Sequence, residues 1–192
     1  ALFGNPDFDA FEADVIYIHT GIHNIMNFPV MTDTEEQVNA KLEAEYAHFL
    51  AVWEKCAEKK NCVIIQNNFE YPSWRLLGNK DASDQHGKVN FISRLNLKFE
   101  EYAQKTENFF IHDVNYLSAR CGIEAWEDPF YWNMYKYCPA VPLIPELAFS
   151  VANIIKSVYG KNERTFTCIA ILPIEPIKIA LSCKTVEKIK EK

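Results

Sequence analysis

Short apolar runs alternate with amphipathic stretches along most of the chain. The runs are rich in β-branched and aromatic residues and predict strands at residues 15–18, 62–65, 109–111 and 166–172. Continuous runs of this kind are typical of parallel strands that are covered on both faces. Apolar residues at steps of three and four predict helices over residues 35–60, 89–102, 115–120, 143–159 and 174–191. This alternation predicts a three-layer α/β/α sandwich with a mostly parallel sheet.

The stretch 35–60 carries the clearest helical pattern. Its apolar residues form one stripe, which comprises Val38, Leu42, Tyr46, Phe49, Trp53 and Cys56. Thr32-Asp-Thr-Glu35 has the spacing of a capping box, in which a hydroxyl and a carboxylate satisfy the first free amides of a helix. We therefore expect a long amphipathic helix that starts at this box and packs on the sheet.

Composition is that of an ordinary globular protein. The 192 residues predict a single domain, with residues 1–160 as its main body and residues 165–192 as an added strand and helix. The formal net charge of −6 argues against nucleic-acid binding, which needs a basic face. We expect no membrane span, because no apolar run approaches about 20 residues. We see no signal peptide, and the six cysteines form no Cys-x-x-Cys pair, so we expect reduced thiols and a cytoplasmic location.

Polar residues stand where the first and third predicted strands end. The first strand runs into a loop that contains or adjoins His19, Gly21, His23 and Asn24, and His112 follows the third strand. In open α/β sheets, ligands bind beyond the carboxyl ends of the strands, so we expect the functional site here. His23 and His112 are candidate catalytic groups, because imidazole titrates near neutrality. The alternative is that each histidine only bonds loop backbone.

The stretch 67–87 is a long polar loop, which is often a sign of function. Asn67, Asn68, Asn79 and Asp81 are its candidate ligand-binding residues, although Asn and Asp side chains also favour turns. Lys136 is a further candidate in the aromatic segment 126–137, where its stem alternatively covers apolar surface. The sequence has no glycine-rich phosphate loop and no metal-ligand spacing, so we expect no cofactor and no metal ion.

The first strand and its loop resemble a conserved block of a known family. Asp14-Val-Ile-Tyr-Ile-His-Thr-Gly-Ile-His-Asn24 is similar to the third block of SGNH (GDSL-type) hydrolases, a strand followed by Gly-x-Asn-Asp. Gly21 matches, His23 stands at the oxyanion-hole asparagine and Asn24 at the aspartate. The resemblance implies an SGNH-hydrolase or flavodoxin-like sheet with a crevice beside this loop.

A closer resemblance is to the SGNH-like domain at the front of FkbH-type proteins, where it precedes a haloacid-dehalogenase-type (HAD) domain. It is carried by Val63-Ile-Ile-Gln-Asn-Asn-Phe-Glu-Tyr-Pro72, Leu77-Gly-Asn-Lys-Asp81, the segment 112–122, and Trp126-Glu-Asp-Pro129 with Trp132 and Lys136. These motifs cover most of residues 10–160. The resemblance implies a role in the biosynthesis of a natural product or a surface polysaccharide, with a HAD-type partner domain.

Two features depart from the hydrolase pattern. No Gly-Asp-Ser nucleophile turn precedes Asp14, and the stretch 167–181, which looks like the family's first strand and helix, contains the turn Pro173-Ile-Glu-Pro176 without a nucleophile. Tyr135-Lys-Tyr-Cys-Pro139 has a cysteine where the base of the Asp-x-x-His block would sit. We expect the strand at 166–172 to take the central place in the sheet, in a rearranged position.

These departures favour a domain that binds a small substrate or a carrier-linked acyl or glyceryl group without the usual esterase machinery. One alternative is an active esterase or acyl hydrolase with a non-standard serine–histidine pair, for which Ser73 and Ser83 are the nearest serines. Another is a structural or docking module whose crevice is filled by Tyr17, Tyr71 or the aromatic residues of 126–137. A serine oxygen within about 3.2 Å of a histidine nitrogen in the crevice would favour the hydrolase.

Overall fold

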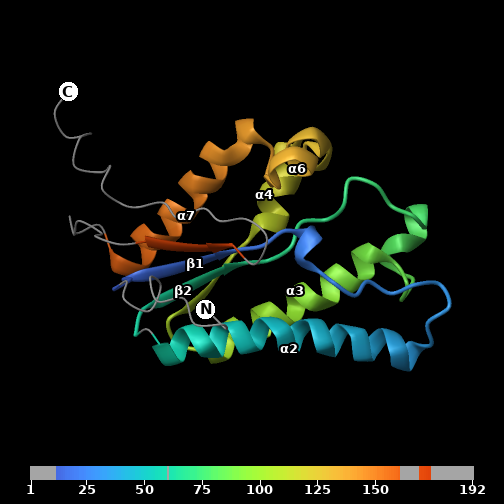
Figure 1. The fold of residues 1–192 in the computed structure, drawn as a ribbon, viewed down its shortest axis with the longest axis horizontal. Helices are drawn as coiled ribbons and strands as arrows, with labels where there is room; N and C mark the ends of the chain where they lie inside the picture. The colour runs from blue at the N-terminus through green and yellow to red at the C-terminus, as the bar shows by residue number, and fades with distance from the viewer. Residues whose placement is uncertain (1–11, 60, 161–168, 174–192) are drawn as a thin grey trace.

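A parallel β-sheet lies between two layers of helices (Figure 1). The computed structural model describes residues 12–59, 61–160 and 169–173. The strands are β1 (Val15–His19), β2 (Val63–Asn67), β3 (Phe109–His112) and β4 (Ile169–Pro173). They pair in parallel in the order β3-β2-β1-β4. The predicted three-layer α/β/α fold is confirmed.

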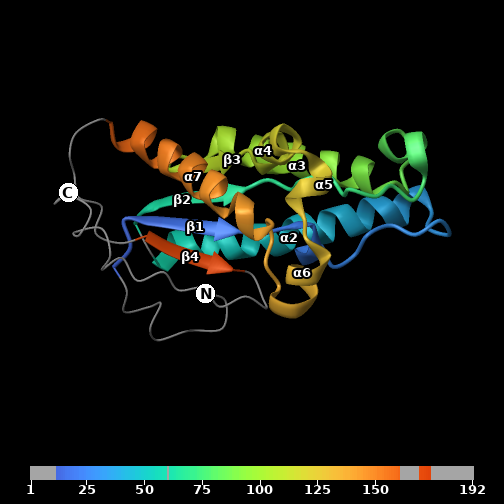
Figure 2. The ribbon, with the colours of Figure 1, turned by 90° about the horizontal axis from the view of Figure 1, so that it is seen from above.

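Long helices cover one face of the sheet, and shorter helices gather on the other (Figures 1 and 2). The first layer contains α2 (Glu35–Lys59) and α3 (Lys88–Lys105), and the second contains α4 (Val114–Cys121) and α7 (Ile144–Tyr159). Between α4 and α7 the chain forms α5 (Ile123–Trp126) and α6 (Pro129–Tyr135). Short 3-10 helices stand in the connections: η1 (Ile22–Asn24), η2 (Gly78–Ala82) and η3 (Val141–Leu143).

Successive side chains of β1 point to opposite faces of the sheet, so β1 contributes to a hydrophobic core on each face. Ile16 and Ile18 join the cluster that contains Phe49 and Trp53 of α2 and Phe99 of α3. On the opposite face, residues of β1 and β2 pack with α7, in a cluster of Val15, Tyr17, Val63, Ile65, Val151 and Ile155. The period of two in a strand therefore sends Tyr17 toward α7, on the side where His112 also lies.

The capping box of α2 lies two residues later than expected. The Gln37 amide donates to the Thr34 hydroxyl at 3.3 Å, and the Thr34 amide donates to the Gln37 side chain at 2.8 Å. The expected box at Thr32 and Glu35 is therefore wrong. A box needs its carboxylate or amide at the third helical position, and Glu35 is the first residue of α2.

β4 occupies an edge of the sheet. It pairs in parallel with β1, from Val15 opposite Ile169 to His19 opposite Pro173. Within the described residues no strand lies on its other side, so the expected central place for residues 166–172 is wrong. Residues 166–168 and the predicted helix at 174–191 lie outside the described residues, and the division into 1–160 and 165–192 stays a prediction.

The segment Val141–Tyr159 is apolar on average, although it contains Glu146 and Lys156. Among the described residues, this is the one helix that is long enough and apolar enough to cross a membrane, judged by length and composition alone. Its mean hydropathy is 1.4. The expectation that no apolar run approaches this length is therefore wrong. A single helix of this kind says little about a membrane, because core helices of soluble proteins pass the same test, and Val151 and Ile155 pack here against the sheet.

The described cysteines are reduced thiols, as predicted. Cys56 is buried, and Cys62, Cys121 and Cys138 are partly buried. Cys168 and Cys183 lie outside the described residues.

Candidate functional site

The carboxyl end of β3 opens into a pocket between α4 and α7. The cavity has a volume of about 320 Å³. Its apolar walls include Leu117, Phe149 and Ile154, and its polar groups include His112, Asp113, Arg120, Ser150 and Asn153. Arg120 forms an exposed ion pair with Glu146 at 2.8 Å. A cavity of this size, largely apolar with a few convergent polar groups, is typical of a small-ligand site.

His112 forms the buried polar floor of this pocket. Its side chain is 1% exposed, and its Nε2 lies 2.9 Å from the Ser150 hydroxyl of α7. Its Nδ1 lies 3.0 Å from the Tyr17 hydroxyl of β1. Both ring nitrogens are therefore engaged, one toward the pocket and one toward the interior of the protein.

The hydrogen-bonded chain continues past Tyr17 to the loop after β1. The Tyr17 hydroxyl lies 3.4 Å from His19 Nδ1, and His19 Nε2 lies 2.7 Å from the Cys138 carbonyl oxygen. His19 and His112, both predicted from the sequence as site residues, are thus joined through Tyr17. These hydrogen bonds connect the pocket with the segment that follows α6.

Burial keeps the hydrogen-bonded side chains of His112, Tyr17 and His19 neutral. It lowers the pKa of His112 to about 4, and the neighbouring His19 lowers that pKa further while Asp113 opposes the shift. Burial also lowers the pKa of His19, against a hydrogen bond to Cys138 that raises it. The pKa of Tyr17 is raised by burial and then by the charge of Glu70. Desolvation disfavours every charged form here, so neutral rings prevail near neutral pH.

The loop Gly21–Asn24 is packed tightly against Glu70. A Cβ atom at Gly21 would lie 3.2 Å from Glu70 Oε1 and 3.5 Å from Cys138 Sγ, so the close approach explains the glycine. The Asn24 side chain accepts a bond from the Gly21 amide and closes η1. Glu70 is 3% exposed and accepts bonds from the Ile22 amide and from Cys138 Sγ. Burial raises the pKa of Glu70.

His23 and Lys136 meet on the ring of Trp132, away from the pocket. The His23 ring stacks on Trp132 with a centroid separation of 3.8 Å, and Lys136 Nζ lies 5.2 Å from the same ring. His23 Nε2 also forms a 2.7 Å hydrogen bond with Glu127 Oε1. These contacts hold α6 against η1. A catalytic role of His23 stays a prediction, and the structure does not bring this residue together with His112.

Asn67 and Asn68 use their side chains to brace the ends of the strands. Asn67 bonds both the amide and the carbonyl of Thr20. Asn68 donates to Asp113 and accepts from the Asn115 amide, each at 2.9 Å. Asn68 therefore fixes the turn from β3 into α4, directly beside His112. A direct ligand contact of either asparagine stays a prediction.

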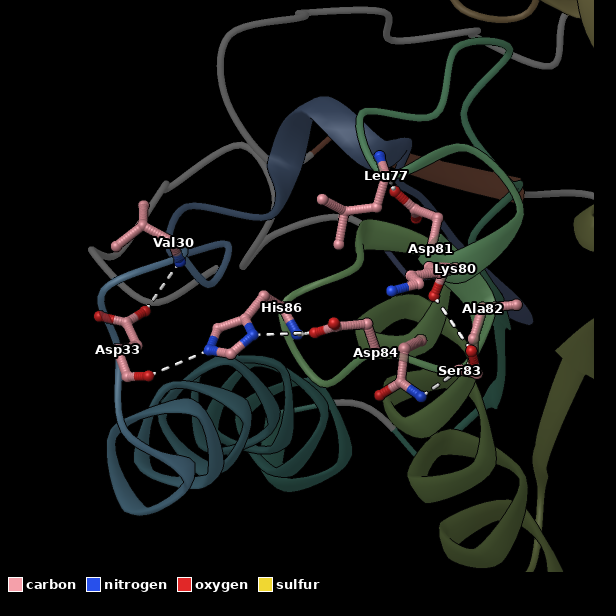
Figure 3. A network of polar contacts seen from close by, with 10 residues as sticks. Val30, Asp33, Leu77, Lys80, Asp81, Ala82, Ser83, Asp84 and His86 are labelled. Atoms are coloured by element: carbon pink, nitrogen blue, oxygen red, sulfur yellow. Dashed lines mark hydrogen bonds and ion pairs between the residues drawn. The ribbon is translucent and has the colours of Figure 1, made fainter.

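Asp81 belongs to a separate region, where the 67–87 loop meets the start of α3 (Figure 3). Asn79 lies in the same 3-10 helix, η2. Asp81 is fully buried and accepts bonds from the Val89 and Leu77 amides. Asn79 is exposed on η2. Neither residue lines the pocket between α4 and α7, and their role in ligand binding stays a prediction.

The serine that approaches a histidine is Ser150. Ser73 and Ser83, the serines that the sequence suggested, are both exposed, and the Ser83 hydroxyl donates to the Lys80 carbonyl. Ser150 and Asn153 are polar residues three positions apart in an otherwise apolar stretch of α7, and this spacing is the signal that could have indicated them. Within the described residues, no group of three or more His, Cys, Asp or Glu side chains is placed to hold a metal ion.

The alternative of a docking module, with a crevice filled by Tyr17, Tyr71 or the aromatic residues of 126–137, stays a prediction. Tyr17 is buried, and Trp126 of the aromatic segment packs with α4. Phe130 and Met134 of α6, by contrast, are 62% and 61% exposed. None of these side chains lines the pocket over His112.

Three comparisons place the chain among known proteins. The family model described as "FkbH, N-terminal domain" matches residues 4–156. No curated protein matches the chain in sequence. Among solved structures, it is similar to the N-terminal part of the protein BF1531 from Bacteroides fragilis, described as containing a phosphatase domain complexed with Mg. The TM-score is 0.66 at 19% identity, with 81% of this chain and 40% of that chain covered. A likeness at this identity shows the fold, and the chain spans two fifths of that structure.

Proposed function

The chain belongs to the FkbH N-terminal domain family, and we propose that it is the substrate-binding domain of a biosynthetic protein of this type. The substrate is a small molecule, or an acyl or glyceryl group linked to a carrier, in the assembly of a natural product or a surface polysaccharide. A HAD-type domain in the same protein or in a partner would act on the bound group. The phosphatase domain of the structural neighbour supports this pairing.

The observation that carries the proposal is the pocket over His112. Its volume of about 320 Å³ lies at the small end of the range of ~300–1,000 Å³ for ligand sites, which suits a group of a few carbon atoms. Leu117 and Phe149 supply apolar walls, and Ser150 supplies a polar contact at the floor. The pocket lies at the carboxyl end of a strand, where open α/β sheets bind their ligands.

Binding without turnover is favoured by the position of Ser150. An acyl-transfer nucleophile needs oxyanion donors, which are commonly free backbone amides. Ser150 lies inside α7, where backbone amides bond to carbonyls one turn earlier. A base with a pKa of about 4 is also poorly matched to proton abstraction at neutral pH.

The test is a binding titration with defined probes. We expect the N-acetylcysteamine thioesters of glyceric acid and of acetic acid to shift the NMR signals of His112 and Phe149. Ser150→Leu should fill the pocket and weaken binding by about tenfold or more, which is about 1.4 kcal/mol. Ser157→Leu on the exposed side of α7 is the matched control and should leave affinity unchanged. Equal affinities for both variants, or shifts confined to residues away from the pocket, would contradict the proposal.

A second candidate function is acyl hydrolysis or acyl transfer, favoured by the 2.9 Å separation of Ser150 Oγ and His112 Nε2. The relation to SGNH hydrolases stays a prediction and belongs to this candidate. Turnover of p-nitrophenyl acetate that Ser150→Ala and His112→Gln both abolish would support it. A fluorophosphonate that labels Ser150 would identify the nucleophile by mass spectrometry. Unlabelled protein with background turnover would refute this candidate and leave the binding function intact.

A further inference from the structure

We propose that Tyr17 and His19 are positioning residues that hold His112 as the Nδ1–H tautomer, so that Ser150 presents only hydrogen-bond acceptors to the pocket. The ligand class that fits such a floor is an alcohol hydroxyl or an amide N–H. The consequence for the ligand rests on the proposed binding function. The tautomer itself does not, and it can be tested in the free protein.

The direction of the hydrogen bonds is fixed at the Cys138 end. A carbonyl oxygen only accepts, so His19 Nε2, at 2.7 Å from the Cys138 oxygen, carries a proton. In a neutral imidazole the other nitrogen then has no proton. His19 Nδ1 is therefore an acceptor, and its neighbour is the Tyr17 hydroxyl at 3.4 Å.

The direction of the bond between Tyr17 and His19 determines the direction of the bond between Tyr17 and His112. Its single hydroxyl proton is donated to His19, so its oxygen accepts from the other neighbour, His112 Nδ1 at 3.0 Å. His112 Nδ1 consequently carries the ring proton, and Nε2 is left as an acceptor. The Ser150 hydroxyl, at 2.9 Å from Nε2, must then be the donor in that bond. The only proton of the Ser150 hydroxyl is then used, so this hydroxyl can offer only its lone pairs to a ligand in the pocket that Ser150 lines.

The reverse direction of the hydrogen bonds leaves the partly buried His19 Nδ1 without a donor. If Tyr17 donated to His112, the lone pair of His19 Nδ1 would face the lone pairs of the tyrosine oxygen. An unsatisfied buried acceptor costs about 1–3 kcal/mol, and even part of this cost on the partly buried His19 ring favours the first arrangement. A charged His19 would remove the constraint, but burial lowers the pKa of His19 and of His112. Both histidine rings therefore stay neutral, and the hydrogen bonds from His19 to Ser150 keep the direction described above.

Long-range ¹H–¹⁵N correlation spectra of the histidine rings test the proposal, because they show which ring nitrogen carries the proton. The five histidines are assigned with single His→Gln variants. At neutral pH we expect a protonated Nδ1 for His112 and a protonated Nε2 for His19. In Tyr17→Phe, His112 Nδ1 loses its acceptor, so the ring should shift to the Nε2–H tautomer and donate to Ser150. His19 should keep its Nε2 proton in that variant.

Ser150→Ala is the matched control, because it removes a partner on the other side of the ring and should leave His112 in the Nδ1–H tautomer. A His112 ring protonated at Nε2 in the unmodified protein would overturn the proposal, whatever the stability of the variants. A Tyr17→Phe protein that folds and keeps the Nδ1–H tautomer would overturn it as well. Neither result bears on whether the thioester probes bind, so a failure here is distinct from a failure of the proposed function.

Discussion

Asp81 stabilises the start of α3 from outside the helix, and its removal is the sharpest test of how the 67–87 loop is held. The N-cap residue of α3 is Gly87, which has no side chain to bond the first amides. Asp81 Oδ1 takes that place and accepts from the Val89 amide at 2.7 Å, while Oδ2 accepts from the Leu77 amide at 3.3 Å. Figure 3 shows Asp81 with Leu77 in this turn.

The expected cost follows from the groups left without partners. Loss of a capping side chain costs ~1 kcal/mol, and a hydrogen bond to a buried charged group contributes ~1.5–3 kcal/mol. We expect Asp81→Ala to lower the free energy of unfolding by about 3 kcal/mol. Asp81→Asn keeps one acceptor for Val89 and should lose about 1 kcal/mol. For a domain of this size, ~1 kcal/mol corresponds to ~2–4 °C in Tm.

Urea denaturation followed by circular dichroism measures these losses. Asn79→Ala is the control, because Asn79 is exposed on the same 3-10 helix and should change stability by less than about 0.5 kcal/mol. The reasoning is refuted if Asp81→Ala costs no more than Asn79→Ala. Gly87→Ala should also be strongly destabilising, because a Cβ there would collide with the Asp81 backbone.

Three further predictions concern titration and close packing. A hydrogen bond to the Asp33 carbonyl and, as the smaller cause, one to Asp84 raise the pKa of His86 (Figure 3). Protonated His86 therefore stabilises the fold fully below about pH 6.5, and this contribution is lost as the pH rises through the pKa of the folded state. His86→Gln should therefore destabilise more in acid than in base by urea midpoints, and an equal loss would contradict this. The pKa of His112 is lowered to about 4, so the folded state favours the neutral ring. The contribution of His112 to the free energy of unfolding is therefore fully present above about pH 6.5 and decreases as the pH falls toward 4. An NMR midpoint near 6.5 for its ring would be inconsistent with burial. Gly21→Ala should lower the free energy of unfolding by ~1 kcal/mol through the contact with Glu70, and an unchanged melting temperature would exclude that contact.

The layers of the fold were predictable because hydrophobic periodicity reports burial directly. The stripe from Val38 to Cys56 predicted α2, and the apolar run at Val15–Ile18 predicted a strand covered on both sides. The cap of α2 was misplaced by two residues, since Thr32 and Thr34 are both followed by suitable partners and only backbone geometry chooses between them. The edge place of β4 depends on which strands pair, and a single sequence does not encode that locally.

The candidate site was predictable in part. The rule that ligands bind at the carboxyl ends of strands led to His19 and His112, and both lie in the buried chain beside the pocket. Ser150 was missed because it is 38 positions from His112 and lies in a helix that the pattern marks as apolar. Asp81 looked like a loop ligand, whereas its amide partners are set by the way the loop folds back on α3. The hydrophobic periodicity of a sequence does not report such contacts between distant segments.

The pairing of β1 with β4 has a consequence for how the protein is made. β1, β2 and β3 lie within the first 112 residues, whereas the partner for the other edge of β1 begins at Ile169. At ~5–20 residues per second, the ribosome needs several seconds to deliver that partner after β3 has emerged. During this interval the apolar edge of β1 is an open template for pairing with another nascent chain. We therefore expect the yield of soluble protein to respond to chaperone supply and to slow codons placed between α7 and β4.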